Sequence, residues 1–213
     1  MGLLVTETFV SLLGESSFVG LPAFFIRLSG CNLRCRYCDT TYAYAPGTEY
    51  RVADLVAALQ ATGLGLVLVT GGEPLLQADC PRLLQALAEV GCTVLLETNG
   101  SRPVGDLDPR VHRIVDLKGP SSGMAEHNYL QNLEYLADRD ELKCVVADRA
   151  DFDWALQIIV ARRCWERHQV LFAPVFGVLP PAVLAAWLLE TRLPLRLNLQ
   201  IHKYIWSPEA RGV

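Results

Sequence analysis

The 213-residue chain lacks several features that would place it in a particular class of protein. It has no apolar run of the roughly 18 residues that are needed to cross a bilayer. It has no surplus of basic residues, because 19 lysines and arginines stand against 23 acidic residues, and this argues against nucleic-acid binding. The N-terminal stretch lacks the basic flank of a signal peptide and carries Glu7 and Glu15. We therefore expect a cytoplasmic protein that binds neither membranes nor nucleic acids.

The chain also lacks internal repeats, low-complexity tracts and a recognisable linker, so we expect one domain over residues 1–213. Short apolar runs alternate with amphipathic stretches, and this pattern predicts strands that alternate with helices. The predicted strands are 23–29, 65–71, 93–98, 113–117, 141–147, 170–175 and 195–203. The predicted helices are 51–63, 79–91, 151–165 and 181–190. This alternation favours parallel strands joined by right-handed crossovers.

Polar clusters follow five of the predicted strands, with the sequences SGCN, TGGEP, ETNG, DLKGP and LQIHK. In a barrel of parallel strands the C-terminal ends form the rim where substrates bind. A complete eight-unit barrel needs about 250 residues, and some predicted strands have little helix between them. The sequence therefore predicts an α/β fold, an incomplete (β/α) TIM-like barrel with reduced helix content.

Seven cysteines in a cytoplasmic protein point to metal or redox chemistry rather than disulfides. Cys80, Cys92, Cys144 and Cys164 lie among apolar neighbours, where buried thiols act as small hydrophobic side chains.

Cys31, Cys35 and Cys38 form a compact loop that lacks a nearby fourth cysteine. Three thiolates can hold three corners of an iron–sulfur cubane and leave one iron free for a small ligand. A zinc site completed by His127 or His202 and an electron-transfer cluster with a remote fourth cysteine are alternatives.

The cysteine loop, the aromatic Tyr37 within it and the later TGGEP resemble the radical S-adenosylmethionine superfamily. The resemblance implies a 4Fe–4S cluster on the three cysteines, with S-adenosylmethionine chelating the fourth iron. An electron from the cluster then cleaves the sulfonium to give a 5′-deoxyadenosyl radical.

Segments spread over nearly the whole chain are more closely similar to the 7-carboxy-7-deazaguanine synthase family. They are SLLGES, AFFIRLSGCNLRCRYCDT, TGGEPLLQ, ETNGS, DLKGPSS, ELKCVVAD and RLNLQIHKYIW. This family implies a carbon–nitrogen lyase of queuosine and 7-deazapurine biosynthesis. It would contract 6-carboxy-5,6,7,8-tetrahydropterin to 7-carboxy-7-deazaguanine, release ammonia and use Mg²⁺.

The same resemblance implies the residues that bind the cofactors. Thr40 is expected to bind Mg²⁺, and the glycine pair before Glu73 lets the backbone approach a ligand while Glu73 accepts from its ammonium. The expected contacts to S-adenosylmethionine are Tyr37, Cys38, Asp39, Gly72, Glu73, Lys118, Gly119, Pro120, Ala173, Pro174, Val175 and Phe176. The stretch APVF at 173–176 departs from the Gln-Pro-Met pattern that we associate with the family.

The resemblance also implies a set of substrate contacts. These are Leu12, Leu13, Gly14, Glu15, Arg27, Thr70, Gln200 and His202. The Arg27 guanidinium suits a substrate carboxylate, and Gln200 and His202 would face the same way on the last predicted strand. Leu13 stands where we expect glutamine and Ser16 where we expect glycine.

Two other functions remain open on the sequence. An activase that abstracts hydrogen from a glycine of a partner protein would share the cluster, and an iron–sulfur carrier would need a fourth protein ligand. For partners we expect a pterin substrate, a flavodoxin-like electron donor and a homodimer that covers exposed sheet edges.

Overall fold

The computed structural model describes residues 2–213 as one nine-stranded sheet in the order β3-β1-β2-β4-β5-β6-β7-β8-β9. Every pairing from β2 to β9 is parallel, and the two end strands do not pair with each other. The parallel strands are β2 (Pro22–Leu28), β4 (Leu66–Gly71), β5 (Thr93–Thr98), β6 (His112–Asp116), β7 (Glu141–Val146), β8 (Gln169–Pro174) and β9 (Arg196–Leu197). The prediction of an incomplete barrel is confirmed.

Two strands that the sequence analysis did not predict extend one edge of this sheet. β1 (Leu3–Leu12) pairs antiparallel with β2, and β3 (Thr48–Tyr50) pairs antiparallel with β1. The register sets Glu7 opposite Arg27, so β1 brings a carboxylate next to a residue that we expected to bind substrate.

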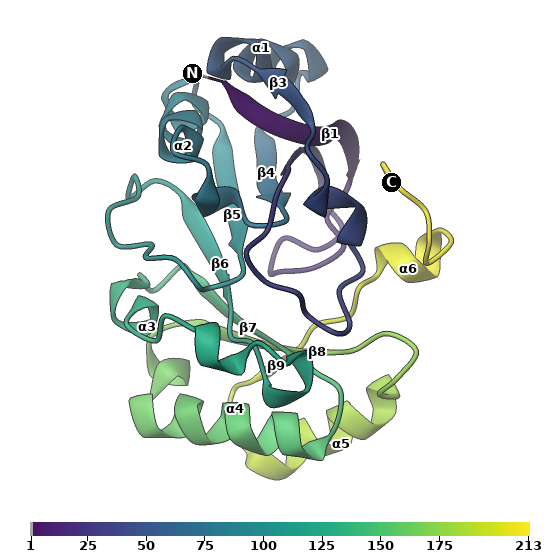
Figure 1. Cartoon of the computed structure of the whole chain (residues 1–213). Helices are drawn as coiled ribbons and strands as arrows, with labels where there is room; N and C mark the ends of the chain where they lie inside the picture. The colour runs from purple at the N-terminus through teal and green to yellow at the C-terminus, as the bar shows by residue number, and fades with distance from the viewer. Residues whose placement is uncertain (1) are drawn as a thin grey trace.

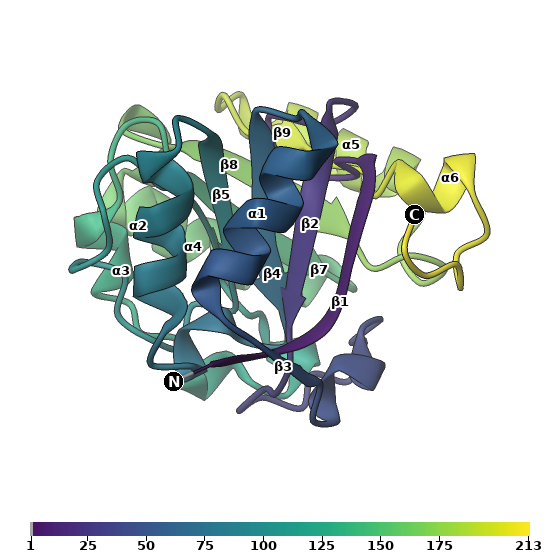
Figure 2. The same ribbon diagram turned by 90° about the horizontal axis from the view of Figure 1, so that it is seen from above.

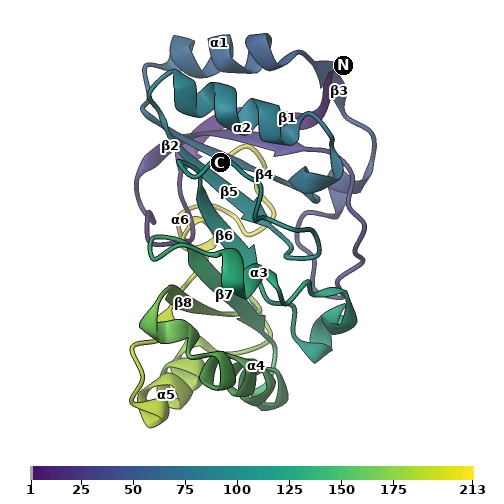
Figure 3. The ribbon, with the colours of Figure 1, turned by 90° about the vertical axis from the view of Figure 1, so that its left-hand side faces the viewer.

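Four helices pack on the outer face of the curved sheet. They are α1 (Val52–Thr62), α2 (Cys80–Glu89), α4 (Arg149–Arg162) and α5 (Pro181–Thr191). Figures 1 and 3 show α1 and α2 beyond one end of the sheet and α4 and α5 beyond the other, and Figure 2 shows α1 and α2 side by side. Their apolar side chains join alternate residues of the strands in the larger of two hydrophobic clusters. Burial of this outer surface supplies most of the apolar stabilisation.

Little helix separates some strands, as the sequence predicts. The link between β6 and β7 carries only η3 (Pro120–Ser122), η4 (Ala125–His127) and the four-residue α3 (Asn132–Tyr135). η1 (Thr41–Tyr44), η2 (Pro74–Leu76) and η5 (Cys164–Glu166) are also single turns.

The inner face of the sheet is layered along the strand direction. A small apolar cluster that includes Phe25, Leu68, Leu95 and Ile114 fills its middle. Because residues two apart on a strand point to the same face, the next inner residues toward the C-terminal ends are Arg27, Thr70, Glu97 and Asp116. The fold thus places a polar layer directly above an apolar one.

The prediction of a strand over 195–203 is wrong. β9 has only two residues, and His202–Ile205 form the short helix α6. The Ile201 amide donates to the Gly14 carbonyl at 3.0 Å instead of continuing the sheet, so Gln200 and His202 do not alternate along a strand.

The scattered cysteines lie in or against the core. Cys80, Cys144 and Cys164 are fully buried, and the half-buried Cys92 packs against the larger hydrophobic cluster. No helix formed by residues 2–213 is long and apolar enough to span a bilayer.

Candidate active site

The three clustered cysteines lie on the loop that follows β2. All three thiols are free and half-buried. Burial raises the pKa of the Cys35 thiol, and the neighbouring Cys38 and Cys31 raise it further, whereas Lys118 opposes the shift. Three accessible sulfurs that influence one another, with a cation beside them, suit an iron–sulfur cluster.

Other segments hold this loop in place. The Arg36 amide donates to the Ser122 carbonyl at 3.1 Å, and the Tyr37 hydroxyl donates to the Val145 carbonyl at 3.2 Å. The Asn99 side chain lies 3.7 Å from the Cys31 sulfur. The loop is therefore supported by the segments that follow β5 and β6 and by the C-terminal end of β7.

Gly72 is needed because the cysteine loop approaches its backbone closely. A Cβ at position 72 would lie 2.1 Å from the Gly30 carbonyl oxygen and 2.8 Å from the Cys31 Cβ. No other residue fits these distances. The glycine that we expected near the cofactor thus fixes the distance between TGGEP and the first cysteine.

The prediction that the Glu73 side chain accepts from a ligand ammonium is wrong. The Glu73 side chain is fully buried. Its oxygens accept from the Leu75 amide at 2.9 Å, the Thr98 hydroxyl at 2.8 Å and the Asn99 amide at 2.6 Å. The carboxylate joins η2 to the end of β5, and only the Glu73 backbone can meet a ligand.

A charged layer lies at the C-terminal end of the barrel interior, next to the cysteine loop. At its centre the Lys143 ammonium lies 3.3 Å from Glu15, 3.3 Å from Glu97 and 3.5 Å from Asp116. Lys118 binds the other oxygen of Asp116 at 2.6 Å, and Thr70 donates to Glu97 at 3.1 Å. We call Glu15, Glu97, Asp116, Lys118 and Lys143 the charged floor.

The charged floor holds one more carboxylate than it holds cations. The pKa of Asp116 is lowered, because Lys118 and Lys143 outweigh the effect of its burial. Burial raises the pKa of Glu15 to about 7, since Lys143 only partly offsets it and Glu97 adds to it. Glu15 can therefore exchange a proton near neutral pH, as acid–base and binding groups do.

Arg27 lies at the edge of the charged floor with part of its guanidinium engaged. Its Nε donates to Glu7 Oε1 at 2.7 Å, and the Tyr42 hydroxyl donates to the same oxygen at 2.8 Å. Within residues 2–213 the bond from Nε to Glu7 is the one hydrogen bond of the Arg27 side chain. Its two terminal amino groups can therefore bind an added carboxylate.

Asp39 and Thr40 lie where the cysteine loop meets the C-terminal segment. Asp39 accepts from Lys203 at 2.6 Å and from Gln200 at 3.2 Å. Although burial opposes it, Lys203 lowers the pKa of Asp39. The Thr40 hydroxyl donates to Asp39 at 2.9 Å. Residues 2–213 contain no group of three or more His, Cys, Asp or Glu arranged to hold a single metal ion, so the Mg²⁺ role of Thr40 stays a prediction.

The expected substrate segment 12–14 is already engaged with the protein. Leu13 is buried, its amide donates to the Leu21 carbonyl and its carbonyl accepts from Gly20. His202 lies against Gly14, where a Cβ would come within 1.9 Å of its Nδ1. Burial and then Lys203 lower the pKa of His202. The Leu13 backbone is thus bonded within the protein, and the substrate contacts expected of residues 12–14 stay a prediction. Glu97 of the charged floor is among the groups that act on His202.

The other two predicted cofactor segments follow β6 and β8. Gly119 is packed against Asp151, and Pro120 begins η3. Ala173 and Pro174 end β8, and the Val175 amide donates to Val146 at 2.9 Å.

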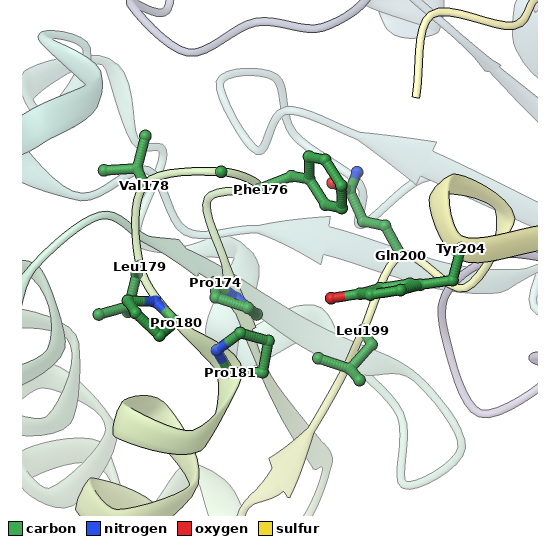
Figure 4. Close-up of a pocket in the computed structure, with 10 residues that line it drawn as sticks. Pro174, Phe176, Val178, Leu179, Pro180, Pro181, Leu199, Gln200 and Tyr204 are labelled. Carbon is green, nitrogen blue, oxygen red and sulfur yellow. The ribbon is translucent and has the colours of Figure 1, made fainter. Parts of the chain in front are cut away.

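A cavity of about 300 Å³ lies beyond the end of β8 (Figure 4). Figure 4 shows Phe176, Gln200 and Tyr204 on one side of it and Leu179 with two prolines on the other. Most of its walls are apolar, and Gln200 connects it to Asp39. A flat aromatic group could pack there.

Sequence reasoning missed five residues of the site. They are Glu7, Tyr42, Glu97, Asp116 and Lys143. Glu97, Asp116 and Lys143 are charged residues in apolar strands, and each lies two positions after a residue that faces the barrel interior. This spacing places their side chains in the interior as well, where charged groups need partners, and it could have identified them.

Comparisons with known proteins agree with this architecture. The Radical SAM superfamily matches residues 25–119. The 7-carboxy-7-deazaguanine synthase of Chlorobaculum tepidum is 49% identical over 98% of this chain and 96% of its own length. That of Koribacter versatilis is 40% identical over 98% and 99%. The crystal structure of QueE from Escherichia coli has a TM-score of 0.73 at 24% identity and covers 93% of this chain and 94% of its own.

Proposed function

The chain belongs to the 7-carboxy-7-deazaguanine synthase family of radical S-adenosylmethionine enzymes, and on this premise we propose the reaction that it catalyses. It converts 6-carboxy-5,6,7,8-tetrahydropterin to 7-carboxy-7-deazaguanine with release of ammonia. One observation carries the proposal: the three free thiols lie on the loop beside an interior layer of charged groups that suits a polar ring with a carboxylate.

Cys31, Cys35 and Cys38 would hold the 4Fe–4S cluster, and the segments at 72–73, 118–120 and 173–176 would hold S-adenosylmethionine. When bound, these groups supply the 5′-deoxyadenosyl radical that starts the reaction. The apolar cavity beside Phe176 supports an adenine at that end of the site. Mg²⁺ would bind near Thr40, where Asp39 adds a carboxylate.

The residues of this chain orient the substrate by charge. The terminal amino groups of Arg27 would bind the substrate carboxylate as a fork. The carboxylates of the charged floor would accept hydrogen bonds from the N–H groups of the pyrimidine ring. Glu15 is suited to this, because its pKa of about 7 lets it adopt the protonation state that the ring requires.

The test is an anaerobic incubation of the cluster-loaded protein with 6-carboxytetrahydropterin, S-adenosylmethionine, reductant and Mg²⁺. We expect 7-carboxy-7-deazaguanine and one ammonia per product. Cys35→Ala should abolish both product and cluster iron, whereas Cys92→Ala, which changes a half-buried cysteine away from the loop, should keep them.

Two outcomes would point elsewhere. Cleavage of S-adenosylmethionine without pterin product would remove the proposed reaction, and cleavage in proportion to a partner protein would favour an activase. A cluster whose electron paramagnetic resonance signal does not change on adding S-adenosylmethionine would favour an electron carrier.

We further propose a cytoplasmic homodimer that takes electrons from a flavodoxin-like protein. The exposed edge strand β3 supports a dimer, because an edge has unpaired backbone groups. Light scattering of the purified protein would test the dimer: a monomeric mass at micromolar concentration would contradict it.

A further inference from the structure

The C-terminal segment returns to the edge of the active site. α6 and the end of the chain lie on the side of β1, as Figures 1 and 2 both show. Lys203 and Gln200 bind Asp39, and Tyr204 packs edge-on against Phe176 with ring centroids 5.7 Å apart. This segment therefore contacts both the cysteine loop and the segment after β8.

Beyond α6, Arg211 lies on the face of Tyr42. Its guanidinium carbon is 4.1 Å from the ring centroid, which is a close cation–π distance. The guanidinium carbon of Arg27 lies 5.8 Å from the same ring. Tyr42 and Arg27 also share Glu7 Oε1. The guanidinium groups of Arg27 and Arg211, which are 184 positions apart in sequence, therefore both contact the Tyr42 ring.

No carboxylate of residues 2–213 forms an ion pair with Arg211, in contrast to Arg27 and Lys203. Around Tyr42 and Asp39, three cations (Arg27, Lys203 and Arg211) therefore face two carboxylates, Glu7 and Asp39. In the charged floor two cations face three carboxylates. The site is positive at its edge and negative at its floor once Glu15 is ionised.

We propose that Arg211 determines specificity: together with Arg27 it selects pterins whose ring carries an anionic substituent. The inference deepens the proposed function and rests on it. A ligand with a carboxylate at one end and N–H donors at the other fits this polarity in one orientation. Arg211 adds a positive charge to the carboxylate end that Glu7 does not neutralise.

The experiment compares two ligands by anaerobic calorimetry on cluster-loaded protein with S-adenosylmethionine and no reductant, so that no turnover occurs. The ligands are 6-carboxytetrahydropterin and its neutral 6-carboxamide. Arg211→Gln should weaken binding of the carboxylate about fivefold, as expected for a partly exposed ion pair, and leave the carboxamide unchanged. Arg211→Lys should keep most of the preference, and added salt should reduce it.

Arg82→Gln is the matched control, since Arg82 is an exposed arginine on α2, away from Tyr42. It should change neither affinity. Equal weakening of both ligands by Arg211→Gln would mean that the tail only shapes the site, and no change would mean that Arg211 does not meet the substituent; either overturns the inference. If the wild-type protein forms product while Arg211→Gln keeps its preference, only the inference fails. Absence of product from the wild type overturns the proposed function first.

Discussion

The barrel interior has a polar cluster at each end, and the two are built differently. At the N-terminal end, Glu141 accepts from the Ser17 amide at 3.1 Å and from the Ser17 hydroxyl, and pairs with His112 at 2.9 Å. At the C-terminal end, Glu15 shares Lys143 with two other carboxylates. One cluster matches each acceptor to a donor, and the other has a surplus of acceptors.

The two glutamates respond in opposite ways to burial. The pKa of Glu141 is lowered, because the bonds to His112 and Ser17 outweigh the cost of its burial. The pKa of Glu15 is raised to about 7. A buried carboxylate with its own donors stabilises the fold, whereas one that lacks them can bind a ligand or a proton. The contrast separates a structural cluster from a functional one.

Lys143→Met should produce the largest effect. Removing the ammonium leaves Glu15, Glu97 and Asp116 without their shared cation, so the pKa of Glu15 rises and Glu15 becomes protonated at pH 7. We expect kcat/KM to fall about 10²-fold, which corresponds to the roughly 3 kcal/mol lost when a buried ion pair is broken. Unchanged substrate affinity at pH 7 would show that the charged floor is not a binding surface.

Glu141→Gln should weaken the polar cluster at the N-terminal end of the barrel and leave the catalytic activity unchanged. The free energy of unfolding should fall by about 2 kcal/mol, since His112 and Ser17 lose a charged partner. Urea unfolding gives this value, and kcat/KM per folded molecule should stay at the wild-type level. A loss of activity at unchanged stability would remove the contrast between the two ends.

The pH dependence of substrate binding should sharpen the comparison. Glu15 has a folded-state pKa raised from 4.5 to about 7, so it ionises as pH rises through this value. If the Glu15 carboxylate accepts from the pyrimidine, the dissociation constant of the substrate should fall about tenfold for each unit that the pH rises toward 7. Above pH 7 the dissociation constant should become constant. Calorimetry from pH 5.5 to 8.5 (chosen to span about 1.5 units on either side) measures this. Glu15→Gln should flatten the profile.

The same titration has a predictable effect on stability. Because the raised pKa means that the folded state holds this proton more tightly, Glu15 contributes stability below pH 4.5 that is lost as pH rises through about 7. The gain in binding and the loss in stability should therefore occur over the same pH range.

Ser16→Gly should have the smallest effect. Ser16 has a φ of 72°, in the left-handed region that favours glycine, which explains why glycine was expected there. Its hydroxyl accepts from the Phe18 amide at 3.1 Å, and this bond offsets part of the strain. We expect the free energy of unfolding to rise by about 0.5 kcal/mol. Ser17→Gly is the control and should destabilise, because it removes a partner of Glu141.

Much of the fold and the cysteine loop could be predicted, because both depend on local patterns. Alternating apolar runs specify the strands from β2 to β8, and the cysteine spacing lies within eight residues. The strand predicted over 195–203 failed because LNLQIHK alternates like a strand, whereas Gly14, from the far end of the chain, binds Ile201 and ends the pairing.

The partners within the site could not be predicted in this way. Glu73 was expected to face a ligand, but Thr98 and Asn99, which follow 25 and 26 positions later, donate hydrogen bonds to its carboxylate. Glu7 was noticed only as an acidic residue near the N-terminus, and its pairing with Arg27 depends on the β1–β2 register. Such contacts depend on the packing of distant segments, which short patterns do not encode.

The contact between Gly72 and the cysteine loop has a consequence for how this sequence can change over time. Because the Cβ of any other residue would collide with Gly30 and Cys31, a substitution at 72 is acceptable only if the loop moves as well. Moving the loop would displace the first thiol from its neighbours. TGGEP and the cysteine loop, which are about 40 residues apart, therefore constrain each other, and a substitution at 72 requires a compensating change in the loop.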